Sequence, residues 1–243
     1  MVLAKHLSDR VAGVNDWDDP VTVLAAWEHG TGNHAAYSQS VWCAVSEIWI
    51  SILRLFQVTA LLSSSQSRLA AAQAGVRQAD FIILLAEDSA LRAVGVFDRV
   101  LVALNAVFAL GNAPENCLRH VIMKNAAVLE SPVIKPLKQL QSFADRRRKE
   151  RDALVHRSGY LDLDIGLLAV AESAPETGAN AVKDHLALEG VSIATYVAEL
   201  VDDQVRLNTE ADKLARRVLD ALLPEYLKRY ERMQSAAGQR RAS

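Results

Sequence analysis

The chain has 243 residues, of which 51% are apolar and only 6% aromatic, and it carries a formal net charge of −2. This length suffices for one large domain or two small ones with a substantial core, and the near-neutral charge excludes a globally basic nucleic-acid coat. Abundant Ala and Leu, with only 11 Gly and 6 Pro, indicate an all-α protein. The two cysteines, Cys43 and Cys117, lie far apart without a CxxC partner, which favours free thiols in a reducing cytosol.

The first 35 residues show neither a signal peptide nor a metal site. Charged residues interrupt the apolar positions that a signal peptide needs. The acidic turn before Pro20 lacks the Gly and the distal Glu of a calcium loop, and His29 and His34 have no third ligand nearby. We therefore expect no metal and no cofactor.

A first long helix is predicted over residues 39–62, because apolar residues recur there at steps of three and four. Its expected core positions are Val41, Val45, Ile48, Ile52 and Leu55. The run is long enough to span a membrane, but Glu47 and Arg54 fall in its middle, where each charge would cost roughly 2.5–3.5 kcal/mol at the bilayer centre. We therefore expect a core helix of a cytosolic protein with no membrane partner.

The next predicted elements are a polar connection over 63–80 that includes some helix, a second long helix over 79–110 that ends at Gly111, and a short helix over 112–129. The second helix should bury a stripe formed by Leu84, Leu91, Val94, Phe97, Leu101, Leu104 and Phe108. The whole region lacks the alternating pattern of strands.

The remaining chain continues the helical pattern. A helix over 134–157 should bury Leu137, Leu140, Phe143 and Leu154, an extended connection should cover 161–171, and a last long helix should cover 192–233. Pro224 should kink or break this last helix. Its expected buried residues include Leu200, Val205 and Leu214.

A local reversal of charge marks the end of the 134–157 helix. Between Arg146 and Arg157 there are six basic residues and two acids, a formal charge of +4 in a chain of −2. Such a segment suggests an anionic partner, usually phosphate. Within it, an Arg-Asp pair is followed four residues later by a histidine, in Arg151, Asp152 and His156, before Gly159 as a helix stop.

This arrangement resembles the HEPN superfamily of small helical bundles, whose mark is an Arg, a polar residue and then a His near a helix end. The resemblance covers residues 78–232. It implies an all-α, HEPN-like bundle over 78–234 and says nothing specific about the first 75 residues. Residues 1–77 are expected to form additional N-terminal helices packed on the bundle. Residues 235–243 are expected to form a disordered basic tail.

The same residues suggest a chemistry. His156 suits proton transfer near neutral pH, Arg151 suits charge neutralisation at a phosphate, and Asp152 shares a helix face with His156 and could orient its imidazole. The expected phosphate-binding residues around them are Arg146, Arg147, Arg148, Lys149 and Arg157.

Positions 151 and 156 lie about 140° apart around a straight helix, so one helix does not aim both at one phosphate. A π-bulge, a frayed last turn, or a site shared between two chains would each resolve this difficulty. The resemblance implies the third, since HEPN proteins are generally homodimers whose motifs meet at a two-fold axis.

The sequence thus predicts a metal-independent RNA endonuclease of the toxin or defence type, or a catalytically silent RNA or nucleotide binder. An antitoxin partner is implied by the resemblance alone. The alternative, from another class, is a non-enzymatic helical interaction protein whose basic helix end docks an acidic partner.

Overall fold

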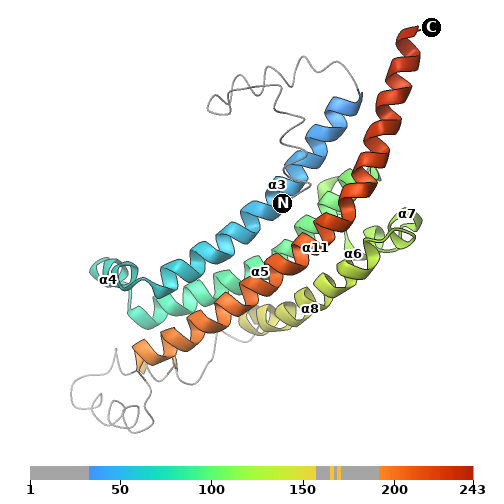
Figure 1. Ribbon diagram of the computed structural model, residues 1–243. Coiled ribbons are helices and arrows are strands. Elements are labelled where there is room, and N and C mark those ends of the chain that lie inside the picture. The colour runs from blue at the N-terminus through green and yellow to red at the C-terminus, as the bar shows by residue number, and fades with distance from the viewer. Residues whose placement is uncertain (1–32, 157–164, 167–168, 171–191, 243) are drawn as a thin grey trace, which may run out of the picture. The chain divides into compact units, whose positions relative to one another are not determined.

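The computed structural model describes residues 33–156, 165–166, 169–170 and 192–242 (Figure 1). All regular structure within these ranges is helical, which confirms the predicted all-α helical bundle. Four helices are long: α3 (Asn33–Ser63), α5 (Gln78–Phe108), α8 (Ile134–His156) and α11 (Ile193–Ala242). The short elements are α4 (Ser65–Gln73), the 3-10 turn η1 (Pro114–Asn116), α6 (Arg119–Ile122) and α7 (Ala126–Leu129).

The chain divides into two compact units. Unit 1 comprises Met1–Ile50, Val96–Ser142 and Asp212–Ser243, and unit 2 comprises Ser51–Gly95 and Phe143–Ala211. Each of the four long helices contributes one segment to each unit. The predicted division at residue 77 does not coincide with this grouping, because α3 supplies core residues to both units.

Polar and aromatic contacts hold the helices of unit 1 together. The Tyr37 hydroxyl at the start of α3 donates a hydrogen bond of 2.8 Å to the Val107 carbonyl near the end of α5. The Tyr37 ring stacks on Tyr226 of α11 with a centroid distance of 5.6 Å. Farther along α3, Glu47 pairs with Arg99 of α5 at 3.3 Å. The α3 and α5 segments of this unit are therefore antiparallel, since residue numbers rise on one while they fall on the other.

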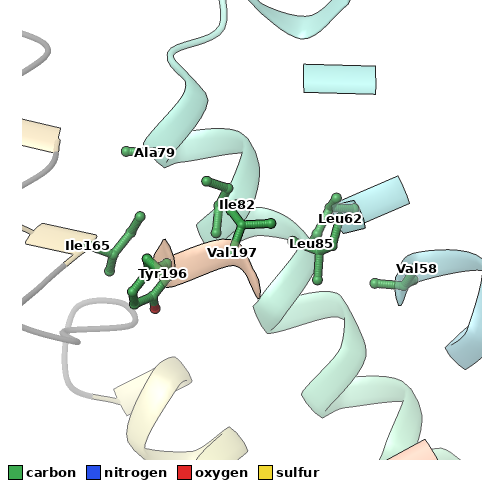
Figure 2. Packing of buried hydrophobic residues seen from close by; sticks show 8 residues of the cluster. All are labelled: Val58, Leu62, Ala79, Ile82, Leu85, Ile165, Tyr196 and Val197. Atoms are coloured by element: carbon green, nitrogen blue, oxygen red, sulfur yellow. The ribbon is translucent and has the colours of Figure 1, made fainter. Parts of the chain in front are cut away.

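Unit 2 has its own apolar core, made by side chains from α3, α5 and α11 with one residue from the chain before α11 (Figure 2). Its buried members are Val58, Leu62, Ala79, Ile82, Leu85, Ile165, Tyr196 and Val197. Two buried amides adjoin this core. The Asn208 side chain donates hydrogen bonds of 2.8 Å to the Thr59 hydroxyl and 3.1 Å to the Leu55 carbonyl. The Gln204 side chain accepts a hydrogen bond from the Ser89 hydroxyl.

The predicted helix over 112–129 is wrong as a single element, because the structure has three one-turn pieces there. Gly111, with φ +74°, turns the chain after α5, as its predicted role as a helix stop requires. Asn125 has an extended backbone, and its side chain accepts a hydrogen bond of 3.0 Å from the Ala127 amide. An asparagine in this role is a helix N-cap, so it starts a new helix where a longer one was predicted to continue.

The end of the chain also differs from expectation. Helix α11 continues past Pro224 to Ala242, so Pro224 does not end it and the segment from 235 onward is helical rather than a disordered tail. A proline removes its own backbone N–H bond from the helix ladder, and the buried Leu222 and Tyr226 anchor the helix on both sides of it. The extended connection over 161–171 is helical at 165–166 and 169–170, and its other residues lie outside the described ones.

The predicted core of α3 is confirmed, since all five of its expected positions are buried. The stripe predicted for α5 is correct from Val94 onward but wrong at Leu84 and Leu91, which are 59% and 48% exposed. Leu85, the next residue after Leu84, is only 8% exposed. The segment is apolar around most of its circumference, so spacing alone does not decide which leucine faces inward. Val205 on α11 is likewise exposed.

Neighbouring leucines on α5 provide a matched test of this inward direction. Leu85→Ala should lower the free energy of unfolding by about 2–3 kcal/mol, because it removes buried methyl groups and leaves a cavity. Leu84→Ala should change it by no more than about 0.5 kcal/mol, since the side chain is largely exposed. Urea unfolding of both variants measures the difference. Equal losses would contradict the assigned orientation of α5.

Helix α3 has the length and composition of a membrane span. Residues Ala35–Ser63 reach a mean hydropathy of 1.5, and 39% of the most apolar window is buried within the chain. No other helix among the described residues passes this test. Glu47 and Arg54 in its middle are both exposed, on one side of the helix as predicted. A helix in a protein core that carries one polar stripe also has this length and mean hydropathy, so these two properties do not by themselves identify a membrane span.

Candidate functional site

The Arg-Asp-His motif lies in the last two turns of α8. This helix is continuous from Ile134 to His156, as predicted for the motif helix. Leu137, Leu140 and Phe143 are buried and confirm its predicted inner face. The predictions that concern Arg157 and Gly159 lie outside the described residues, as do those on the side chains of Arg151, Leu154 and His156.

Two of the basic residues that precede the motif are already paired with carboxylates. Arg146 donates a hydrogen bond of 2.7 Å to Glu210 of α11, and its guanidinium lies 5.8 Å from the Phe143 ring centroid. Arg148 pairs with Asp145, one turn earlier, at 3.0 Å. The positive charge expected from the sequence is therefore partly neutralised within unit 2. Glu210 was missed because it lies 64 residues away along the chain, on another helix.

Arg147 is placed differently from its basic neighbours. It is only 6% exposed, so its expected role as a surface phosphate ligand is not supported by its position. The reason is helical spacing: position 147 is four residues after Phe143 and seven after Leu140, on the inner face of α8. This spacing was readable from the sequence. Lys149, by contrast, is exposed.

The helix geometry narrows the ways in which the motif could form one site. Residues 151–156 are α-helical throughout, so no π-bulge rotates His156 toward the position of Arg151. Position 156 is two turns after exposed Lys149 and one turn after half-buried Asp152. Positions 149, 152 and 156 thus fall on one side of the helix by their spacing, whereas position 151 is one turn after buried Arg147. Two of the three predicted ways to bring positions 151 and 156 to one phosphate remain: a frayed last turn of α8, and a site that a second chain completes.

Other potential chemistry is sparse in the described part of the chain. It contains no group of three or more His, Cys, Asp or Glu side chains placed to hold a metal ion. Cys43 is exposed and Cys117 is buried, and burial, followed by the nearby Glu115 carboxylate, raises the pKa of the Cys117 thiol. These thiols lie far from each other in sequence and do not form a disulfide.

Comparison with known proteins adds no assignment to this site: no family model, no curated protein and no solved structure matches the chain.

Proposed function

We propose that the chain is a cytosolic, HEPN-like RNA-binding protein that cleaves RNA without a metal ion at the C-terminal end of α8. The observation that carries the proposal is the uninterrupted helix α8, on which exposed Lys149 and half-buried Asp152 precede position 156 by seven and four residues. It joins a cation, a carboxylate and an imidazole at spacings of three and four residues. These are the groups that phosphate binding and proton transfer require.

The proposed reaction is transfer of the phosphate within the RNA strand. His156 takes the proton from a ribose 2′-hydroxyl, whose oxygen then attacks the adjacent phosphorus. The bond from phosphorus to the 5′-oxygen of the next nucleotide breaks, and that oxygen receives a proton from the imidazolium of His156, which returns the imidazole to its neutral form. Arg151 and Lys149 stabilise the negative charge that accumulates on the phosphate oxygens. Asp152 accepts a hydrogen bond from the imidazole and favours its charged form.

A homodimer completes this site in the proposal. Because positions 151 and 156 are about 140° apart on a continuous α-helix, one copy supplies the histidine face and a second copy supplies the arginine to the same phosphate. Two copies related by a two-fold axis would form two such sites. A catalytically silent RNA binder would use the same surface without the proton transfer. An antitoxin partner belongs to this proposal only through the family resemblance.

The proposal is tested by incubating the purified chain with RNA and DNA strands of the same sequence in EDTA. RNA should be cut and DNA left intact, because DNA lacks the attacking 2′-hydroxyl. The products should carry 2′,3′-cyclic phosphate ends, which mass spectrometry identifies. Cleavage that EDTA abolishes, or comparable cutting of DNA, would show a different mechanism. Retention of RNA without cleavage would identify the silent binder.

A second candidate, a helical interaction protein that docks an acidic partner, is favoured by one observation. Arg146 and Arg148 each already bind a carboxylate, of Glu210 and Asp145 respectively. Arginines of this helix end therefore form ion pairs with carboxylates, the groups that an acidic partner would offer. A chain that binds acidic peptides but shows no affinity for RNA would support this candidate over the first.

A further inference from the structure

A second basic surface lies in unit 1, away from the motif in sequence. Residues 111–142 contain four cations, Arg119, Lys124, Lys135 and Lys138, against two carboxylates, Glu115 and Glu130. The segment therefore has a formal charge of +2 in a chain of −2. All four cations are exposed.

Exposed aliphatic side chains accompany these cations. Each one-turn helix here buries a single aliphatic residue, Ile122 in α6 and Val128 in α7. Leu118 and Leu129 stay 50% and 47% exposed beside them, and Val121 is exposed as well. The core of unit 1 does not use these three side chains, although each exposes apolar area to water.

The connection contacts α8 through Arg119, which brings this cation to the part of α8 that carries Lys138. The Arg119 guanidinium lies 3.3 Å from the side-chain amide of Gln141. Lys138 is three residues before Gln141, so these two positions are neighbours on α8, and Lys135 is one further turn before Lys138. Lys124 lies in the turn between α6 and α7.

We propose that this surface, named the α6–α7 patch and made of Leu118, Arg119, Lys124, Leu129 and Lys138, binds the surface of a membrane that contains anionic lipid. Cations attract the acidic headgroups, and the exposed leucines insert at the boundary of the acyl chains. The chain does not span the bilayer in this arrangement. The proposal departs from the sequence-based expectation of no membrane partner and does not depend on RNA cleavage.

The composition of the patch distinguishes a lipid from a nucleic acid. Surfaces that bind single-stranded RNA use aromatic side chains on which the bases stack. Residues 111–142 contain no Phe, Trp or Tyr, and the apolar side chains exposed there are aliphatic. The exposed leucines of α5 make a useful contrast, because Glu87 lies between Leu84 and Leu91 and the neighbouring Asp88 is paired with Arg92 at 2.6 Å. That face therefore carries no net positive charge to attract anionic lipid.

The test is flotation of the full chain with vesicles of phosphatidylcholine alone and of phosphatidylcholine mixed with phosphatidylserine. The parent should bind the mixed vesicles and not the neutral ones, with an affinity that falls as salt rises. Lys124→Glu/Lys138→Glu should weaken this binding more than ten-fold, since each cation near such a surface contributes about five-fold. Leu118→Ser/Leu129→Ser should weaken it by a similar factor because the inserted apolar area is lost.

Matched controls carry the same chemical changes elsewhere. Lys213→Glu/Lys228→Glu alters two exposed cations of α11, and Leu84→Ser/Leu91→Ser removes two exposed leucines of α5. Both controls should bind mixed vesicles within two-fold to three-fold of the parent, and circular dichroism should show an unchanged fold for all four variants. His156→Ala should also bind as the parent does, which separates this proposal from the proposed nuclease.

Three results would overturn the proposal. The first is failure of the parent to bind mixed vesicles. The second is equal weakening by patch and control variants. The third is weakening by the charge variant but not by the leucine variant, because a patch that needs only its cations is a general polyanion surface. Loss of RNA affinity in the patch variants, with vesicle binding intact, would assign the surface to RNA instead.

Discussion

His156→Ala is expected to reduce RNA cleavage by about two to four orders of magnitude, the range that removal of a general acid–base group produces. Alanine keeps the helix, because position 156 is the last residue of α8 and alanine has the highest helix propensity. RNA affinity should change little, since the proposed phosphate contacts come from Lys149 and Arg151. A fluorescent RNA strand followed by gel and by anisotropy measures cleavage and binding on the same sample.

The control for this experiment is His120→Ala, the same change at an exposed histidine of α6. It should cut RNA at the parent rate. If His156→Ala also cuts at that rate, with contaminating nuclease removed, His156 does not transfer the proton. Equal loss in both variants would instead indicate damage to the fold, which circular dichroism reveals.

Tyr226→Ala is expected to lower the free energy of unfolding by about 4 kcal/mol, near the middle of the range for loss of a buried aromatic side chain. Tyr226 is fully buried in unit 1. Its ring stacks on Tyr37 and lies 5.9 Å from the Tyr230 ring, and its hydroxyl is 2.9 Å from the Ser38 hydroxyl. A loss of this size is a large fraction of the stability of an ordinary domain.

The conservative variant Tyr226→Phe separates the two contributions. It keeps the ring contacts and removes only the hydrogen bond to Ser38, so it should cost about 1 kcal/mol. Chemical denaturation measures both values, and the slope of the unfolding free energy against denaturant concentration should be the same for both variants and the parent. A loss below about 1 kcal/mol for Tyr226→Ala would show that α11 does not pack on α3 through this residue.

Helical periodicity predicted the architecture because it depends on local chemistry. The apolar positions of α3 repeat with little ambiguity, and all five expected core residues are buried. The same rule failed at Leu84 of α5, where apolar residues surround the helix and several inward directions satisfy the pattern. Asn125 shows a different limit. Its capping hydrogen bond starts α7 in a stretch whose composition also suits a longer helix.

The candidate site was predicted only in part, for a physical reason. A count of charges along the chain finds the basic run but not the partners that neutralise it, and Glu210 reaches Arg146 only because α8 and α11 pack together within unit 2. Arg147 was counted as a surface cation although its spacing from Phe143 places it on the inner face. Periodicity applied to the charged residues as well as to the apolar ones would have separated Lys149 from Arg147.

The buried amides of unit 2 have a consequence for alternative packings. Long apolar helices could slide past one another by one turn, about 5.4 Å, and exchange one set of methyl contacts for another at little cost. Asn208 bonds to α3 and Gln204 bonds to α5, one turn apart on the same side of α11. A slide of one turn would leave both amides buried without these bonds, at about 1–3 kcal/mol each. These two side chains therefore select a single register from several that the apolar residues alone would tolerate.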